Sequence, residues 1–491
     1  MTTSISNAEV SPLVSETAET PATSTTQDYT IKHTLASRFV FLILCVAIVL
    51  TALVFGTVHY WALAIFSLGS AAVIILWVID GWKLGRIRVS RNPLQLPLLG
   101  VLALGLIQLL PLRNPGAAEV LSVSPVKTLS LDPYSTRFVL AQVAALTIYF
   151  AATLVFTDTP YRLRLLVRTI TVFGFFLAIF GLTQSFTSPT KVYWFRELTQ
   201  STAFGPFINR HHFAGYMELS LALPLGLLFS GSVKPEMRFI YLFAGGLMGT
   251  ALIMTGSRGG IISLGAEILF LVVVAGFRRK RREPAEQERP QRIRRAATRA
   301  ALALVLIVGL FAGVVLFGGE SALNRFVGTV NSDDPTTGRA HFWSVTLDII
   351  KAHPVLGTGL GAFGVVYTRY DTRNGLFRLE QAHNDYLQIL SDGGLVGAGL
   401  GLIFVILLFR MGFARRESRD DFRSGVALGA LAGCFAALIH SFFDFTLHTT
   451  SNALLFLVLA ALATMNGRVE QAQSRRRRKR RTSDSGPIMI K

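Results

Sequence analysis

The feature that most constrains this chain is a series of continuously apolar blocks, each about as long as a helix needs to cross the roughly 30 Å hydrocarbon core of a bilayer. Hydrophobic residues make up 51% of the 491 residues, and charged residues make up only 16%, whereas a soluble domain has about 25% charged residues. Only helices and closed barrels satisfy their backbone inside lipid, and barrel strands would alternate in polarity. The sequence therefore predicts an all-α, polytopic integral membrane protein.

About twelve such blocks predict twelve transmembrane helices. They lie near residues 38–58, 61–79, 94–112, 137–156, 167–187, 212–230, 239–256, 260–277, 300–318, 394–413, 425–445 and 451–467. Lys and Arg collect on the cytoplasmic side of membrane proteins. With both termini placed inside, most of the 48 Lys and Arg residues fall in cytoplasmic segments, including the basic loop 278–299 and the basic tail. The net charge of +19 thus indicates topology, not nucleic-acid binding, and contact with anionic membrane lipids is a secondary expectation.

Three external segments are longer than simple connections. Residues 113–136 and 188–211 form two loops, and residues 319–393 form the largest. The largest loop contains helix signals and a Gly-rich stretch, and a loop of this length is usually functional or disordered. Residues 1–36, by contrast, are rich in Ser, Thr, Glu and Pro, which predicts a disordered cytoplasmic N-terminus.

One arginine lies at a glycine-rich turn between two predicted spans. Arg258 belongs to the segment Thr255–Gly260, on the external side. Glycines allow a tight turn, and an arginine held there can bind a phosphate or carboxylate with two hydrogen bonds. An arginine that only anchors a helix end at the membrane surface would occupy the same position. Position alone leaves these two interpretations evenly balanced.

A second cationic group lies where the chain enters the sixth predicted span from outside. It consists of Arg210, His211 and His212 and follows Asn209, a typical helix-capping residue. The positive end of that helix would face external solvent and attract anions, with an interfacial polar belt as the equally balanced alternative. About two turns further in, Glu218 is expected to face the bundle interior and to pair with the arginine or with a histidine.

His383 begins a stretch in which polar residues give way to Leu and Ile at helical spacing and then to paired glycines. This pattern predicts a helix that docks at the membrane surface and continues into a transmembrane helix. A histidine there can accept a proton from a sugar hydroxyl near neutral pH. A histidine that only caps the helix or forms a hydrogen bond is the alternative.

His440, Asp444 and His448 recur every four residues at the end of the eleventh predicted span. That spacing places them on one face of a helix and permits a pair of metal ligands. Phenylalanines surround them and no supporting ligand is evident, so a polar network between helices is the favoured interpretation and no metal site is expected.

Four residues converge on the same external face, namely Arg210, Arg258, Arg339 and His383. Two or three arginines and one histidine suit a polyanionic group beside a hydroxyl that is to be deprotonated. The sequence contains no P-loop or dinucleotide fingerprint. Energy for a synthetic reaction would then come from an activated substrate at the membrane, and no cofactor is expected.

On these motifs the chain resembles the bacterial O-antigen ligases and the related O-antigen and exopolysaccharide polymerases. The most specific motif is His-Asn-x-x-Leu, six residues and Gly-x-x-Gly, formed here by His383, Asn384, Leu387, Gly394 and Gly397. Supporting elements are the Ser-Arg-Gly turn at Arg258, the Asn-Arg-x-His-Phe element at 209–213, and Gly338-Arg339 with Trp343, followed by Pro354, Gly357 and Gly359. The resemblance covers about residues 195–410, and the outer spans match only in hydropathy and number.

The resemblance implies a metal-independent, inverting glycosyltransferase of GT-C architecture in the bacterial inner membrane, with its active site facing the periplasm. Such enzymes move a glycan from an undecaprenyl-diphosphate carrier to an acceptor hydroxyl on lipid A-core or on another glycan chain, as in lipopolysaccharide biosynthesis. By analogy, His383 and Arg258 would be catalytic, the histidine orienting or deprotonating the acceptor. Arg210 would bind the diphosphate with Arg258. Arg339, His212 and Asn384 are further candidates for binding the diphosphate or the glycan.

The implied domain organisation has five parts. They are the N-terminus 1–36, the N-terminal transmembrane helices 37–194, the catalytic region 195–410 with its periplasmic loop 319–393, the C-terminal transmembrane helices 411–467 and the basic cytoplasmic tail 468–491. Ligase, polymerase and transfer to protein serines all remain open, because these enzymes share motifs and differ in the acceptor. A multi-span transporter or flippase of lipid-linked oligosaccharide is the alternative from another class, although no six-span internal repeat is evident.

Overall fold

The computed structural model describes residues 33–113, 127–198, 202–276, 301–306, 338–373, 379–416 and 420–465, together with the single residues 297, 308 and 418. Several predictions lie largely outside these residues: the N-terminus 1–36, the basic loop 278–299, the ninth span at 300–318 and the basic tail 468–491. The fold below is that of the described residues.

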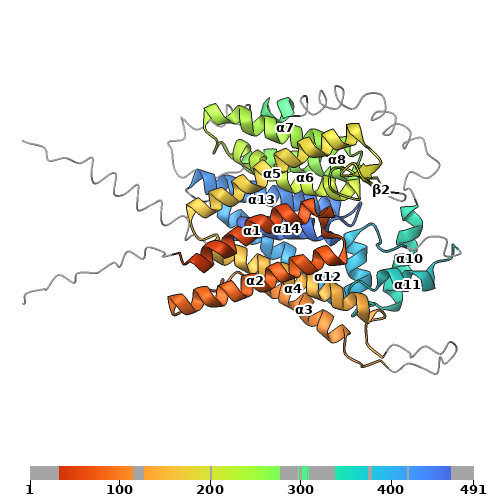
Figure 1. Cartoon of the computed structure of the whole chain (residues 1–491). Helices are drawn as coiled ribbons and strands as arrows, with labels where there is room; N and C mark the ends of the chain where they lie inside the picture. Colours follow the sequence, from red (N-terminus) through yellow and green to blue (C-terminus); the bar gives the residue numbers. More distant parts are fainter. Residues whose placement is uncertain are drawn as a thin grey trace, which may run out of the picture.

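Nine helical segments among the described residues are long and apolar enough to cross a membrane. They are α1 (Leu35–Leu53), α2 (Tyr60–Leu84), α4 (Pro133–Phe156), α5 (Pro160–Thr187), α6 (Arg210–Ser230), α7 (Arg238–Met254, preceded by the short turn Pro235–Met237), α8 (Arg258–Gly276), α12 (Asp385–Arg416) and α13 (Asp421–His440). The predicted all-α, polytopic class is therefore confirmed. Figure 1 shows these helices packed side by side as one bundle.

Two predicted spans are shorter than expected. α3 (Gln95–Gln108) has 14 residues and α14 (Thr450–Thr464) has 15, whereas a full crossing takes about 20. α3 ends where the Gln108 side chain turns to bond the carbonyl of Leu356 at 2.7 Å. α14 begins only after segment 441–449, which forms turns and a short 3₁₀ helix in place of an α-helix. The described residues thus contain two short apolar helices where two full spans were predicted.

Local sequence signals explain where many helices begin. A capping side chain accepts a backbone N–H group of the first turn in each of α4, α5, α6 and α13. The capping residues are Asp132, Thr159, Asn209 and Asp420, respectively. Such caps satisfy N–H groups that have no partner within the helix. Proline occupies the first position of α4 and α5, where no N–H is needed.

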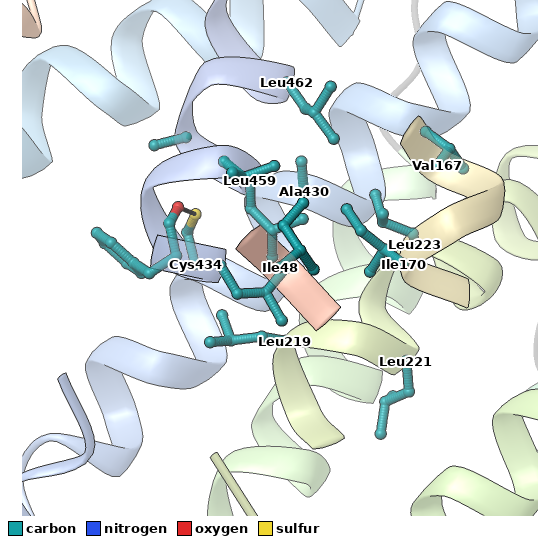
Figure 2. Packing of buried hydrophobic residues seen from close by; sticks show 14 of the residues in the cluster. Ile48, Val167, Ile170, Leu219, Leu221, Leu223, Ala430, Cys434, Leu459 and Leu462 are labelled. Atoms are coloured by element: carbon teal, nitrogen blue, oxygen red, sulfur yellow. Dashed lines mark hydrogen bonds between the residues drawn. The ribbon is translucent and has the colours of Figure 1, made fainter. Parts of the chain in front are cut away.

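α6 is the central helix of the bundle, because nearly all of its residues are buried. A helix that is apolar and buried all round needs neighbours on every side. Figure 2 shows the packing around it: Leu219, Leu221 and Leu223 of α6, Ile48 of α1, Val167 and Ile170 of α5, Ala430 and Cys434 of α13, and Leu459 and Leu462 of α14.

α6 and α13 approach each other through glycines. A Cβ placed on Gly226 would lie 2.2 Å from the Cα of Gly429, and a Cβ on Gly429 would lie 2.4 Å from the carbonyl oxygen of Ala222. Lipid tails are as apolar as the helix surface, so burial of apolar side chains does not drive helices together in a membrane. Small residues allow the close backbone packing that does. The close crossing fixes the relative position of two helices that carry polar residues of the site described below.

α12 joins two helices across a break, as the pattern after His383 predicts. At the break, Gly394 adopts φ 61° and ψ −160°, a conformation that essentially only glycine adopts. The loop 354–361 packs against this break, and the Thr358 N–H donates to the Ser391 carbonyl at 2.9 Å. A Cβ on Gly394 would lie 2.3 Å from the Val355 carbonyl oxygen. The break therefore depends on both the glycine and the loop.

Two short helices form a cap at one end of the bundle (Figure 1). α10 (Arg339–Ala352) confirms the helix expected within the largest loop, and α11 (Phe363–Tyr370) follows it. They share a small apolar core with the chain before α12, consisting of Val345, Ile349, Ala362, Phe363, Val366, Tyr367 and Ala382. A two-stranded antiparallel hairpin, β1 (Lys191–Val192) with β2 (Arg196–Glu197), lies between α5 and α6.

Candidate active site

The starts of α6, α8 and α12 meet the end of α13 at one end of the bundle. The Asp385 N–H at the start of α12 donates to the Ser441 carbonyl just after α13, at 2.9 Å. His211 Nδ1 in the first turn of α6 lies 2.9 Å from Ser257 Oγ, which precedes α8. Polar residues that are far apart in the sequence are thereby gathered in one place.

His383 is held at the start of α12 in an unusual backbone conformation. Its φ is 51°, in the left-handed region where histidine is one of the few enriched non-glycine residues. Asn384 caps the helix, since its Oδ1 accepts the N–H groups of Tyr386 and Leu387 at 3.0 and 3.1 Å, and its Nδ2 donates to the Phe442 carbonyl at 3.1 Å. Asn384 therefore positions His383, and its contact with substrate stays a prediction.

The imidazole of His383 pairs with a buried carboxylate. Its Nδ1 lies 3.1 Å from Oδ1 of Asp444, whose side chain is only 2% exposed. The rings of Phe342 and Phe445 lie beside the imidazole, with centroids 6.1 and 4.8 Å from that of His383. A carboxylate at Nδ1 keeps the proton on that nitrogen and leaves Nε2 as an acceptor. Within the described part of the chain, Nε2 has no hydrogen-bond partner. The general-base role predicted for His383 needs such an accepting nitrogen, and the role itself stays a prediction.

Asp444 is also the meeting point of other polar groups. Arg339 Nη2 donates to its Oδ2 at 3.2 Å, and His211 Nδ1 lies 3.6 Å from the same oxygen. Burial alone would raise the pKa of the Asp444 carboxyl, but the hydrogen bond from His383 and the neighbouring histidine and arginine charges outweigh it. They hold the pKa well below its usual range. The carboxylate is therefore ionised at neutral pH.

A chain of close polar contacts runs from Asp444 into the bundle. His211 connects Asp444 to Ser257, and Ser257 Oγ lies 3.4 Å from His440 Nε2. His440 Nδ1 then lies 2.9 Å from Glu218 Oε2, and neither of these two side chains is exposed. The expected partner of Glu218 is thus a histidine, on a different helix.

The two arginines predicted to bind diphosphate are the first residues of neighbouring helices. Arg210 begins α6 and Arg258 begins α8. A Cβ placed on Gly256, in the turn before α8, would lie 3.8 Å from Arg210 Nη1, so the guanidinium packs over that turn. His211 follows Arg210 in α6, and Ser257 immediately precedes Arg258 at the start of α8. The contact between His211 and Ser257 therefore brings the starts of the two helices together.

The Phe445 ring lies between His212 and the His383–Asp444 pair. The Phe445 ring contacts the imidazoles of both His212 and His383, with centroid distances of 4.9 and 4.8 Å. His212 is 6% exposed, and its carbonyl accepts the side-chain amide of Asn452 at 3.0 Å. The structure gives it a place in the wall of the site, and its contact with glycan stays a prediction.

The expectation that His440, Asp444 and His448 share one helical face is wrong. α13 ends at His440, whose carbonyl accepts both the Phe443 and Asp444 N–H groups as the chain turns away. His448 lies in a separate 3₁₀ turn, and its Nδ1 is 2.6 Å from Asp385 Oδ1. The three residues have three different partners, as in a polar network. Among the described residues, no group of three His, Cys, Asp or Glu could hold a metal ion.

Neither the pairing of Asp444 with His383 and Arg339 nor the bridging position of Ser257 was predicted from the sequence. One signal could have found the first: Asp444 stands among phenylalanines, and a carboxylate in apolar surroundings needs a cationic partner. That signal does not say which of several arginines and histidines is the partner, because the choice depends on how distant helices pack.

Fold and site together define an all-α, multi-span membrane protein with an Asp–His pair and a group of arginines at one end of its helical bundle. A family model described as O-antigen ligase matches residues 243–402, which include Arg258, Arg339 and His383. An O-antigen ligase of Pseudomonas aeruginosa (strain PAO1) is 26% identical over 277 residues, which cover 55% of this chain and 57% of that protein. The chain thus aligns with little more than half the length of this curated relative. Both matches are to O-antigen ligases, and each covers only part of this chain.

Proposed function

We propose that this protein transfers a glycan from a lipid-diphosphate carrier to a sugar hydroxyl, as an O-antigen ligase or a related polymerase. The observation that carries the proposal is the 3.1 Å contact between His383 Nδ1 and the buried carboxylate of Asp444. Such a carboxylate orients the imidazole and stabilises the imidazolium that forms when Nε2 takes a proton. The family match over residues 243–402 supports the same activity.

In the proposed reaction the acceptor hydroxyl gives its proton to His383 Nε2 while its oxygen attacks the anomeric carbon of the donor glycan. The bond between that carbon and the diphosphate oxygen breaks on the opposite face. The bonding electron pair leaves with the lipid diphosphate, and the configuration at the anomeric carbon inverts. Asp444 remains ionised throughout, consistent with its lowered pKa.

The leaving diphosphate needs cationic stabilisation, which we assign to Arg210 and Arg258. Each begins a helix, so its charge adds to the partial positive charge of the helix N-terminus. This arrangement suits a reaction that uses no metal ion. Arg339 has a different place, because its guanidinium donates to Asp444 at 3.2 Å. We therefore assign it to holding the Asp–His pair and regard diphosphate contact as its secondary role.

We further propose that the site faces the periplasm from the bacterial inner membrane. The distribution of basic residues supports this orientation, because the site lies at the end of the bundle opposite the predicted cytoplasmic segments. The acceptor would be lipid A-core for a ligase, or the end of a glycan chain for a polymerase.

The test is complementation of a strain that lacks the gene, followed by gel analysis of its lipopolysaccharide. We expect His383→Ala and, separately, Arg258→Ala to abolish long or capped glycan at unchanged protein level. His353→Ala is the matched control, because His353 follows α10 in the same loop but makes no contact with Asp444. It should leave the glycan normal.

The lipid-linked material that accumulates in the His383→Ala strain separates the two activities. Lipid-linked polymer would indicate a ligase, and single lipid-linked repeat units would indicate a polymerase. Normal glycan in both the His383 and Arg258 variants would overturn the proposed function.

A further inference from the structure

A cavity of about 360 Å³ lies at the end of the bundle opposite His383 and Asp444. Its lining comes from the first turns of α5 and α13, the end of α6, the loop between α6 and α7, and the start of α7. α6 separates the two places, since its 21 residues begin at the active-site end and rise about 30 Å along the helix. The cavity is therefore distinct from the catalytic site and needs its own explanation.

Three basic side chains line this cavity, and its lining includes no acidic side chain. Arg164 and Arg168 are four residues apart, so they project from the same face of α5. Lys234 faces the cavity from the loop between α6 and α7. All three are exposed. Glu236, Asp420 and Asp421 are the nearest acidic residues along the chain and do not line the cavity.

Other basic residues at the same end of the bundle are paired with carboxylates. Arg88 Nη1 lies 2.7 Å from Asp158 Oδ2, and Arg162 Nη1 lies 3.3 Å from the other oxygen of the same carboxylate. Within the described part of the chain, the three cations of the cavity form no ion pair. The cavity therefore has a local positive charge that the neighbouring network does not have.

The position of these cations matches the level of lipid headgroups. α5 has 28 residues and is about 42 Å long, which exceeds the roughly 30 Å hydrocarbon core by about two helical turns. Arg164 and Arg168 lie in the first nine residues of α5, and the apolar stretch 172–182 begins one turn after them. The excess length is thus at the end that carries the two arginines.

Apart from Ser232 and the hydroxyl of Tyr241, the rest of the cavity wall is apolar. It includes Leu227, Val233 and Phe422, and the Arg164 guanidinium lies 5.2 Å above the ring of Phe422. A cation held over an aromatic face keeps a defined position. A free inorganic anion would use only the cations, whereas a molecule with a charged head and an apolar chain would use the cations and the apolar wall together.

We propose that this cavity binds the phosphate headgroup of an anionic phospholipid from the surrounding bilayer. Arg164, Arg168 and Lys234 would contact the phosphate, and the start of the acyl chains would lie against the apolar wall. The bound lipid would connect α5, α7 and α13 at the end of the bundle that lies away from the proposed chemistry.

Native mass spectrometry of the purified full chain tests the proposal, with phosphatidylglycerol and phosphatidylcholine of identical acyl chains as probes. We expect phosphatidylglycerol to bind more tightly, and Arg164→Gln/Arg168→Gln to weaken its binding about twenty-five-fold, or about fivefold for each charge. Phosphatidylcholine has the same phosphate with a compensating choline charge, so the double variant should weaken its binding less. Lys83→Gln/Arg91→Gln is the matched control, because it removes two exposed charges at the same end of the bundle but outside the cavity.

Three outcomes would overturn the proposal. Equal binding of the two lipids would exclude headgroup selection, and equal weakening by both variant pairs would indicate general charge attraction. Displacement of phosphatidylglycerol by inorganic phosphate at millimolar concentration would show an anion site that does not use the apolar wall. If the double variant fails to fold, Lys234→Gln alone provides the test, with an expected fivefold loss.

Discussion

Asp444 and His383 are 61 residues apart in the sequence, yet their Oδ1 and Nδ1 atoms lie 3.1 Å apart. We expect Asp444→Asn to lower kcat for glycan transfer at least about a hundredfold with little change in KM, because an amide favours the wrong imidazole tautomer. Kinetics on purified protein check this. Asp371→Asn is the control, since Asp371 pairs with His341 outside the site at 2.8 Å. A near-normal kcat for the Asp444 variant would show that the Asp444–His383 pair takes no part in the reaction.

The buried pair of Glu218 and His440 should matter for stability. Their side chains are fully buried and 2.9 Å apart, and breaking such a pair leaves one buried polar group without its partner, at a cost of about 3 kcal/mol. We expect Glu218→Gln to lower the thermal unfolding temperature measured in detergent. Glu236→Gln, at an exposed position beyond the other end of α6, should leave it unchanged. Equal unfolding temperatures for the two variants would refute this role.

The glycine crossing of α6 and α13 should not tolerate a side chain. Gly429→Val would place methyl groups against the backbone of Ala222 and is expected to destabilise the protein by about 1–3 kcal/mol. Gly246→Val in α7 is the control, because a Cβ there meets no atom within 4 Å. Chemical denaturation followed by circular dichroism compares the two. Similar denaturation midpoints for the two variants would contradict the prediction, because they would show that α6 and α13 accommodate a side chain at the crossing.

The contact of His448 with Asp385 should make stability depend on pH. Burial alone would lower the pKa of His448, but the hydrogen bond and charge of Asp385 outweigh it, and the pKa is raised from its usual 6.5. A raised folded-state pKa stabilises the fold fully below the unfolded value and loses this effect as pH rises through the folded value. His448→Gln should therefore destabilise the protein more at about pH 5.5 than at about pH 9. A pH-independent difference in unfolding temperature would contradict this assignment.

Local patterns were enough to predict much of the fold. Asn209 followed by an apolar block predicts the start of α6, and the stretch from His383 to the paired glycines predicts two helices joined at a break, which the structure has at Gly394. These features depend on residues close together in the sequence, because caps and glycine conformations are local. Hydropathy alone, however, predicted an eleventh span that continues to residue 445, whereas α13 ends at His440. The polar contacts of the turn after His440 outweigh the apolar character of its phenylalanines.

The partners within the site could not be predicted in the same way. Glu218 and His440 are 222 residues apart, and the sequence offers several arginines and histidines for each buried carboxylate. Which pair forms depends on how closely α6 and α13 pack, and this depends on the glycines at their crossing. Arg339 shows the consequence, because the sequence suggested an anion-binding residue and the structure places its guanidinium on Asp444.

The most direct test of the central claim is the turnover of His383→Ala. The purified full chain would be reconstituted in vesicles with a lipid-diphosphate-linked glycan, an acceptor glycan and a chelator, beside His353→Ala. We expect the His383 variant to lose at least about a hundredfold in kcat while the His353 variant transfers normally. Transfer by His383→Ala within a few-fold of the unaltered protein would contradict the account, because the Asp444–His383 pair would then take no part in the chemistry.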